Sequence, residues 1–307
     1  MEESRVIAAG AETVRGLIDD LDSWSHYHPA AVHAEYLERK DGESLVEQWA
    51  LTGAETVRTW KTRRWDKDSG IAFAHEPAAA PFAEVHGEWV FERRDEKSTL
   101  VRMVHEFTLL EEDAGAAERH REKIRQGSVG FLDTLQYVSE NREELSRLTI
   151  TFEDPLFIAG SIEDAYAYLY EADKWPERMP HVAALQLEET VSNIQFFDMD
   201  TADPDGAHRH STRSVRICLP HRRIVYKQVK LPKLLDGHTG HWDFVETPEG
   251  VIATTRHTAT IKPAALDVLG EGTTVRDARN YLRRVLTNNS MSNLRLTKAY
   301  AEQRAGW

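Results

Sequence analysis

The chain has 307 residues, which is long for one hydrophobic core and predicts two domains, and its 41% hydrophobic and 29% charged residues are typical of a folded globular protein. A net charge of −13, with no basic block that contains aromatic residues, argues against a nucleic-acid partner. The single cysteine, Cys218, cannot form an intramolecular disulfide, no apolar run could cross a membrane, and the opening residues lack a targeting pattern, so we expect a cytoplasmic protein without a membrane anchor.

The first half of the chain predicts a strand, a short helix, several strands and a long helix, in that order. The opening strand covers residues 5–9, and the short helix ends near Trp24. Alternating β-rich runs follow, separated by polar turn sequences. The long helix covers residues 116–148, where apolar residues recur at helical spacing: Ile124, Phe131, Leu135 and Val138.

The second half predicts the same order of elements. A strand over residues 149–158 precedes a short helix, for which Ser161 and Asp164 form a capping pair. Alternating runs again lead to a long helix, over residues 273–303. This order indicates an α+β fold in which a curved antiparallel sheet is wrapped around one long C-terminal helix. Such an arrangement leaves an internal cavity, which is a common place for a small-molecule site.

The two halves also align with each other residue by residue. The offset between matching residues stays between 151 and 153 over three separate segments, which indicates an internal duplication. We therefore predict two tandem domains, residues 1–148 and residues 149–307. The matching pairs are Trp24 with Trp175, Pro29 with Pro180, Ile71 with Ile224, Gly87 with Gly240, Trp89 with Trp242, and His105 with His257.

Strand alternation divides the segment ETVRTWKTRRWD into two faces. One face carries Arg58, Trp60, Thr62 and Arg64. If Trp60 faces the cavity, so does Arg64, and a buried guanidinium needs an anionic group or a developing oxyanion to meet it. The alternative is a basic strand whose charged groups remain at the surface.

The first half also concentrates tryptophans and one histidine of interest. Trp24, Trp49, Trp60 and Trp89 could line a flat cavity, and the alternative for each is ordinary core packing. His105 lies on a strand whose alternation places it with apolar residues, where it could transfer protons near neutral pH. The alternative for His105 is a hydrogen-bonded interior histidine.

Signatures of cofactor and metal enzymes are absent from the sequence. No G-x-G-x-x-G, P-loop, G-x-S-x-G or H-E-x-x-H motif occurs. Two His-x-His pairs, His26 with His28 and His208 with His210, have no cysteine or carboxylate at a ligand spacing. We therefore expect neither a cofactor nor a metal.

Several longer segments resemble one family, the didomain aromatase/cyclases of bacterial type II polyketide synthases. The resemblance implies two helix-grip (START-like) domains that act, without metal or nucleotide, on a poly-β-ketone tethered to acyl carrier protein. It also implies other polyketide synthase components as partners. The segments that carry it are EQWALTGAETVRTWKTRRWD and HGEWVFE in the first half, and WPERMPHVA, STRSVRICLPHRRIVYKQ and HTGHWDF in the second.

The resemblance also implies roles for individual residues. Single-domain relatives carry a Trp-x-Ser-x-Arg strand, which Trp60, Thr62 and Arg64 match with Thr62 in place of the Ser. Arg64 thus inherits the proposed catalytic role, with Thr62 as a hydrogen-bond donor and His105 as the proton-transfer group. The tryptophans and Arg58 are predicted to bind substrate.

In the second half, the same alignment places Arg213 opposite Trp60 and Ile217 opposite Arg64, so the Trp/Arg pair is predicted to be lost. Either the chemistry of that domain uses other groups, such as Arg213, Arg216 or His257, or the domain is a structural or substrate-holding partner. We predict that these three residues bind substrate.

The function that follows is a lyase-type polyketide cyclase that directs regiospecific aldol closure and dehydration of the first ring. In that reaction Arg64 would stabilise the developing enolate and alkoxide oxygens. The alternative is a non-catalytic START-like carrier or chaperone of a hydrophobic ligand, since one fold can serve either function. A carrier needs a cavity but does not need Arg64 or His105.

Overall fold

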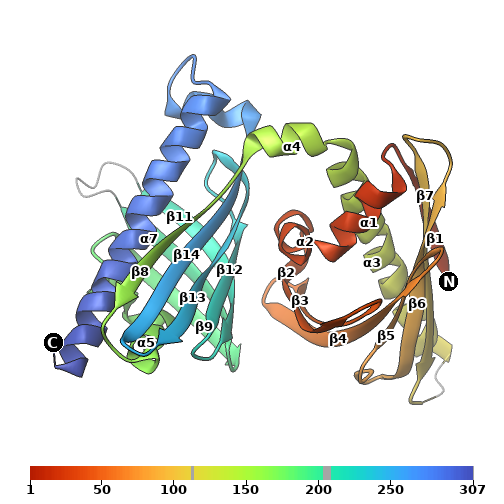
Figure 1. The fold of residues 1–307 in the computed structure, drawn as a ribbon, viewed down its shortest axis with the longest axis horizontal. Coiled ribbons are helices and arrows are strands. Elements are labelled where there is room, and N and C mark those ends of the chain that lie inside the picture. Colours follow the sequence, from red (N-terminus) through yellow and green to blue (C-terminus); the bar gives the residue numbers. More distant parts are fainter. Residues whose placement is uncertain (112–113, 203–208, 307) are drawn as a thin grey trace. The chain divides into compact units, whose positions relative to one another are not determined.

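The computed structural model describes residues 1–111, 114–202 and 209–306, and the chain divides into two compact units, Met1–Glu143 and Glu144–Trp307. Each unit contains one seven-stranded antiparallel sheet and its own long helix (Figure 1). The predicted domain boundary, after residue 148, coincides with the end of α4 (Arg142–Leu148).

The first unit is a sheet of order β1-β7-β6-β5-β4-β3-β2. Figure 1 shows α3 on the concave side of this sheet, with α1 and α2 beside it. The elements are β1 (Glu2–Ile7), α1 (Ala11–Asp19), α2 (Leu21–Tyr27), β2 (Ala31–Lys40), β3 (Glu43–Gly53), β4 (Thr56–Lys67), β5 (Gly70–His75), β6 (Phe82–Arg93), β7 (Thr99–Leu109) and α3 (Ala114–Glu140).

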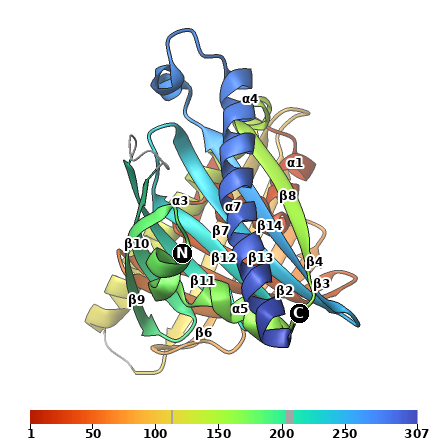
Figure 2. The same ribbon diagram turned by 90° about the vertical axis from the view of Figure 1, so that its left-hand side faces the viewer.

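The second unit repeats this topology, with the order β8-β14-β13-β12-β11-β10-β9. In Figure 2 the long helix α7 crosses in front of β8, β14 and β13. The elements are β8 (Thr149–Ile158), α5 (Ile162–Tyr170), η1 (Ala172–Lys174), α6 (Trp175–Arg178), β9 (Val182–Val191), β10 (Ile194–Ala202), β11 (Arg209–Leu219), β12 (Arg223–Lys230), β13 (Leu235–Thr247), β14 (Gly250–Ile261), η2 (Pro263–Leu269) and α7 (Val275–Ala305).

Local sequence explains where the helices begin and end. The predicted cap is present, because Ser161 Oγ accepts the backbone N–H of Asp164 at the start of α5. A capping box of Thr274 and Asp277 begins α7. The long helix predicted over residues 116–148 is interrupted at Asn141, where the side-chain amide donates to the Tyr137 carbonyl oxygen and competes with the helical backbone.

The core of the first unit lies between α1, α3 and the concave face of the sheet. The stripe predicted on the long helix faces this core, since Leu135 and Val138 are buried and Phe131 packs against the cluster. The second unit has a hydrophobic cluster with more buried residues than the core cluster of the first unit, and this cluster includes Trp175, Tyr226 and Trp242. The tandem helix-grip fold is therefore confirmed. No helix in the described part of the chain is long and apolar enough to cross a membrane.

Candidate functional site

One row of directly paired residues crosses the centre of the first sheet. Arg64 on β4 pairs with Phe73 on β5, Phe73 pairs with Gly87 on β6, and Gly87 pairs with His105 on β7. Residues paired in this way share a face of the sheet, so Arg64 and His105 both belong to the face that carries Phe73 in the core. The two are three strand spacings apart, about 14 Å at the backbone.

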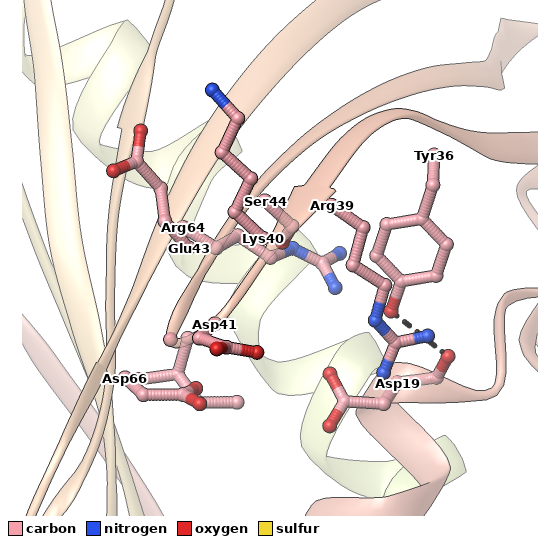
Figure 3. A pocket seen from close by; sticks show the side chains of 11 residues that line it. Asp19, Tyr36, Arg39, Lys40, Asp41, Glu43, Ser44, Arg64 and Asp66 are labelled. Carbon is pink, nitrogen blue, oxygen red and sulfur yellow. Dashed lines mark hydrogen bonds between the residues drawn. The ribbon is translucent and has the colours of Figure 1, made fainter.

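Arg64 lies at the edge of a pocket of about 430 Å³ (Figure 3). The pocket is formed by the end of α1, the β2–β3 hairpin and the adjoining parts of β4 and β5. Its lining is strongly polar and mixes both signs of charge: Asp19, Tyr36, Arg39, Lys40, Asp41, Gly42, Glu43, Ser44, Arg64, Asp66 and Ile71.

The guanidinium of Arg64 is buried, with 6% of the residue exposed, and has few partners. Nη1 donates to the Ile18 carbonyl oxygen at 3.2 Å, and the guanidinium lies 5.5 Å from the Trp89 ring centroid. Nε is buried and has no hydrogen-bond partner among the described residues. Burial lowers the pKa of Arg64, and nearby Tyr36 and Asp19 oppose that change. An arginine stays charged in spite of this, so a buried cation with an incomplete set of hydrogen bonds lines the pocket.

Two hydroxyl groups lie near Arg64. Tyr36 donates from its hydroxyl to the Asp19 carbonyl oxygen at 3.0 Å, and burial raises the pKa of Tyr36. The buried Thr62 accepts a hydrogen bond of 2.7 Å from Gln48 Nε2. Since that bond uses a lone pair of Oγ1, the Thr62 hydroxyl proton remains available for donation.

The contacts of His105 favour one of its two tautomers. Ser128 Oγ lies 2.9 Å from the Ile124 carbonyl oxygen, to which it donates, and 3.3 Å from His105 Nδ1. With the serine proton on the carbonyl, a proton on Nδ1 satisfies the second contact and leaves the lone pair on Nε2. Burial, with help from His75 and the chain's amino terminus, lowers the pKa of His105 to about 4, so the ring is neutral at pH 7.

Three of the four predicted tryptophans lie with the interior aromatic residues. Trp89 lies 4.4 Å from Phe73 between ring centroids, and Trp24 lies 4.4 Å from Phe131 on α3. Trp60 follows Arg58 on the predicted face and lies 6.2 Å from His75.

The placement of Trp49 in the cavity was wrong. Trp49 pairs with Thr59, whereas its neighbour Gln48 pairs with Trp60, so Trp49 belongs to the opposite face of the sheet. There it stacks on His33, with 5.2 Å between ring centroids.

The second sheet contains the same row of residues, shifted by 152 or 153 positions. Arg216 pairs with Tyr226, Tyr226 with Gly240, and Gly240 with His257. Arg216 is therefore the counterpart of Arg64, and the predicted match of Ile217 with Arg64 was wrong by one residue. Because side chains alternate along a strand, that slip moved the comparison to the other face of the sheet.

Although Arg216 and Arg64 occupy equivalent positions, their partners differ. Arg216 is fully buried, and all three of its nitrogens donate hydrogen bonds. Nε donates to Gln195 Oε1 at 3.0 Å, Nη1 to the Leu169 carbonyl oxygen at 3.0 Å, and Nη2 to the Tyr170 carbonyl oxygen at 2.8 Å. Arg216 thus uses each of its three nitrogens in a hydrogen bond within the protein, which favours a structural role.

The two other second-domain candidates also differ from expectation. Arg213 lies on the opposite face from Arg216 and forms ion pairs with Asp198 and, at 3.8 Å, with Glu188, so its placement at the interior was wrong. His257 is interior and buried, with Nδ1 at 2.7 Å from the Tyr226 hydroxyl oxygen. Burial lowers the pKa of His257 well below its ordinary value.

Comparison with known proteins gives a consistent result over almost the whole chain. A family model for polyketide cyclase/dehydrase and lipid transport proteins matches residues 1–136. The actinorhodin polyketide synthase bifunctional cyclase/dehydratase of Streptomyces coelicolor is 37% identical, covering 95% of this chain and 94% of that protein. The corresponding granaticin protein of Streptomyces violaceoruber is 33% identical, covering 99% and 94%. The chain belongs to this cyclase/dehydratase family.

Two solved didomain aromatase/cyclase structures superpose on the full chain. StfQ, from the steffimycin biosynthetic pathway, is 52% identical with a TM-score of 0.89 and covers 100% of both chains. BexL, from the BE-7585A biosynthetic pathway, is 34% identical with a TM-score of 0.87 and covers 98% of both chains. The resemblance to didomain aromatase/cyclases is therefore confirmed, as is their fold.

Several polar groups near the predicted site residues were not identified from the sequence. Tyr36 lines the pocket with Arg64, Gln48 donates to Thr62, and Ser128 contacts His105. His75 pairs with Thr62 and so shares the face of the sheet that carries Thr62 and Arg64. His75 could have been found from alternation, since it is two residues after Phe73 on the same strand. Ser128 could not, because its contact with His105 depends on how α3 packs against the sheet.

No group of three histidine, cysteine or acidic side chains suited to a metal ion occurs within residues 1–111, 114–202 and 209–306. Of the two His-x-His pairs, His28 accepts the backbone N–H of Ala31 through Nδ1 at 3.3 Å. His208 and the side chain of His210 lie outside the described residues.

Proposed function

We propose that this chain is a cofactor-independent polyketide aromatase/cyclase that closes and dehydrates the first ring of a poly-β-ketone, and that residues 1–148 carry the chemistry. The observation that carries the proposal is the buried, incompletely bonded guanidinium of Arg64 at a polar pocket. A carrier of a hydrophobic ligand would not need a charged group there, and the charged lining of the pocket is unfavourable for an apolar molecule.

Arg64 is proposed to stabilise oxygens that become negative during aldol closure. An enolate carbon of the substrate attacks a ketone carbon, and the carbonyl oxygen becomes an alkoxide. A fixed guanidinium in a buried site stabilises that oxygen without having to reorganise, an effect of about 10²–10³-fold in rate for one well-placed donor. The free hydroxyl proton of Thr62, on the same face of the same strand, would donate a second hydrogen bond.

His105 is proposed to serve the dehydration that follows. Loss of water from a β-hydroxy ketone needs a base that removes a proton from the α-carbon, and the base, once protonated, can give that proton to the leaving hydroxide. The Nε2 lone pair of a neutral His105 can act as that base, and a pKa near 4 keeps it available at pH 7. Because Arg64 and His105 are about 14 Å apart, they would act on different parts of one extended substrate.

We infer that the substrate arrives tethered to an acyl carrier protein, in the cytoplasm, beside other type II polyketide synthase components. Relatives that are 31–37% identical over nearly the full chain are named as polyketide synthase cyclase/dehydratases, which supports this set of partners. Tethering also agrees with a pocket that opens at one hairpin of the sheet, because a long chain can enter by one end.

The proposal is tested by reconstitution with a minimal polyketide synthase and identification of the products. Arg64→Ala should fold but lose correctly cyclised product in favour of spontaneous shunt products. Arg64→Lys should rescue little, because an ammonium group does not reproduce the geometry of a guanidinium.

Arg63→Lys is the matched control, since Arg63 is the next residue on β4, alternates to the opposite face from Arg64, and forms ion pairs with Glu76 and the pocket residue Glu43 that a lysine can keep. It should retain the wild-type products. Wild-type product ratios from Arg64→Ala would reject the catalytic role.

A further inference from the structure

A second arginine lies on the same face of β4 as Arg64. Arg58 precedes Arg64 by six residues, which corresponds to about 20 Å along a strand. It is not part of the pocket of Figure 3. An extended chain could touch both arginines, but a single ring could not.

Arg58 is held by aromatic rings and not by carboxylates. Its guanidinium carbon lies 5.9 Å from the Trp60 ring centroid and 5.8 Å from that of Phe82. Nη2 is buried and has no hydrogen-bond partner within the described part of the chain. Nearby Arg63, by contrast, forms ion pairs with three glutamates. Two aromatic rings thus lie beside the guanidinium of Arg58, and its buried Nη2 has no acceptor among the described residues.

His75 adds a second unsatisfied group to this end of the interior. It pairs with Thr62 across β4 and β5, so it shares the face of Arg58 and Trp60. Its Nδ1 is buried without a hydrogen-bond partner in the ranges that the structure describes. Burial and the charge of Arg58 lower the pKa of His75 to about 4, so the ring is neutral at pH 7 and can donate or accept one hydrogen bond.

Two unsatisfied polar groups are costly in an isolated protein. A buried donor or acceptor without a partner costs about 1–3 kcal/mol. A ligand that carries negatively charged oxygen would remove that cost at Arg58 and His75 together. It should also be flat, since the neighbouring rings of Trp60 and Phe82 offer planar surfaces.

We propose that Arg58 and His75 form a second oxygen-binding position, which takes the enolate of a 1,3-diketone unit of the same substrate that reacts at Arg64. This inference rests on the proposed function and names the part of the substrate that binds away from the reacting carbonyl. A diketone enolate is planar and shares its charge between two oxygens, which fits the paired N–H groups of a guanidinium. Arg58 and His75 are therefore positioning residues that hold the extended chain.

The test uses benzoylacetone, a small 1,3-diketone whose enolate absorbs ultraviolet light differently from its neutral enol. Ultraviolet titration in the Arg64→Gln protein reports binding away from the Arg64 pocket. We expect this protein to raise the enolate fraction of the probe at pH 7, and the further change Arg58→Gln to weaken that binding at least tenfold. His75→Phe should weaken it less, and Arg63→Gln should leave it unchanged.

Unchanged enolate binding after Arg58→Gln would overturn the proposal. Displacement of the probe by pantetheine 4′-phosphate at low concentration would also overturn it, because the site would then belong to the phosphate of a carrier arm. If the Arg64→Gln protein is unstable, the same titration is done with the wild-type protein. The number of enolates bound per chain should then fall from two in wild type to one in the Arg58→Gln single variant.

The reconstituted reaction separates this inference from the proposed function. Arg58→Gln should keep ring formation and raise KM or change which carbons join, whereas Arg64→Ala should abolish correct closure. If Arg64→Ala forms wild-type product, the proposed function fails whatever Arg58 does. If only Arg58→Gln behaves as wild type in both binding and product, the second position fails and the function stands.

Discussion

Burial has opposite consequences for the two central residues of the first sheet. Arg64 is buried and keeps its charge, because the pKa of a guanidinium is too high for burial to neutralise it. His105 loses its charge on burial, since the pKa of an imidazole starts near neutrality. The same environment therefore yields a cation that can bind oxyanions and a neutral ring that can accept a proton.

The lowered pKa of His105 predicts a dependence of stability on pH. The folded-state pKa of about 4 lies below the ordinary histidine pKa of 6.5, so the unfolded chain binds the proton first as pH falls. The free energy of unfolding should decrease between pH 6.5 and pH 4, and His105 should account for about 2–3 kcal/mol of that loss at pH 4.5. Urea titrations of wild type and His105→Gln at pH 7 and pH 4.5 measure this difference.

His86→Gln is the control for that experiment. His86 is an exposed histidine that contacts Glu106, so its replacement should not reproduce the effect of replacing the interior His105. If His105→Gln loses as much stability on acidification as wild type does, the assigned burial of a neutral His105 is wrong.

Arg64 and Arg216 occupy equivalent positions and should respond differently to the same substitution. Arg64→Met removes a buried charge with few partners, so it should leave stability unchanged or raise it while abolishing correct cyclisation. Arg216→Met leaves Gln195 and two carbonyl oxygens without donors and should cost about 3–5 kcal/mol, while the folded fraction keeps the wild-type product.

Thermal unfolding and product analysis of both methionine variants make the comparison. A destabilised Arg64→Met, or an Arg216→Met that folds well but cyclises wrongly, would reverse the two assignments.

At the scale of elements, the close packing of β5, β6 and β7 depends on Gly87, which has no side chain. A Cβ at Gly87 would lie 1.9 Å from the Val104 carbonyl oxygen and 2.8 Å from Phe73 Cζ. The glycine thus lets the ring of Phe73 lie over β6, between Trp89 and His105. In the second sheet Tyr226 lies over Gly240 in the same way.

Gly87→Ala should therefore destabilise the protein by about 1–3 kcal/mol, because the new methyl group has to displace backbone as well as Phe73. The matched control is Gly127→Ala on α3, where a Cβ would meet nothing within 4 Å. That change should be neutral or stabilise by up to about 1 kcal/mol, since alanine favours a helix over glycine. Chemical denaturation compares the two, and equal effects would contradict the close approach at Gly87.

At the scale of the whole molecule, a duplicated fold has diverged between its two interiors. The first has Phe73 beside an arginine with a free nitrogen, at a pocket of about 430 Å³. The second has Tyr226, whose hydroxyl is bonded to His257, beside an arginine whose nitrogens are all bonded. Equivalent rows of residues thus leave an arginine incompletely hydrogen-bonded in one domain, where we propose a ligand site, and are joined by internal hydrogen bonds in the other.

This division predicts that the second interior can change without changing the product. Tyr226→Phe should cost about 1–2 kcal/mol, because it removes the hydrogen bond to His257 in a buried site. The reconstituted enzyme should still form the first ring with wild-type regiochemistry. An altered ring pattern from Tyr226→Phe would place chemistry in the second domain and contradict the proposed division.

Sequence patterns alone determined the features that depend on neighbouring residues or on repetition. The alternation of β4 correctly grouped Thr62 with Arg64, the cap at Ser161 was correct, and the repeat predicted two similar domains. The predictions for Trp49 and Arg213 were wrong for other reasons. Trp49 was placed without the register of its strand, and the alignment of the two halves was one residue off in β11.

Only the tertiary structure decided that Arg216 is fully hydrogen-bonded at its three nitrogens whereas Arg64 is not. Strand register made Arg216, and not Ile217, the counterpart of Arg64, since pairing across strands cannot be read from one strand. Hydrogen bonds from Arg216 to carbonyl groups near the end of α5 depend on how that helix packs on the sheet. The sequence of one strand thus shows that an arginine can face the interior. Whether the N–H groups of that arginine have hydrogen-bond acceptors depends on residues far away along the chain.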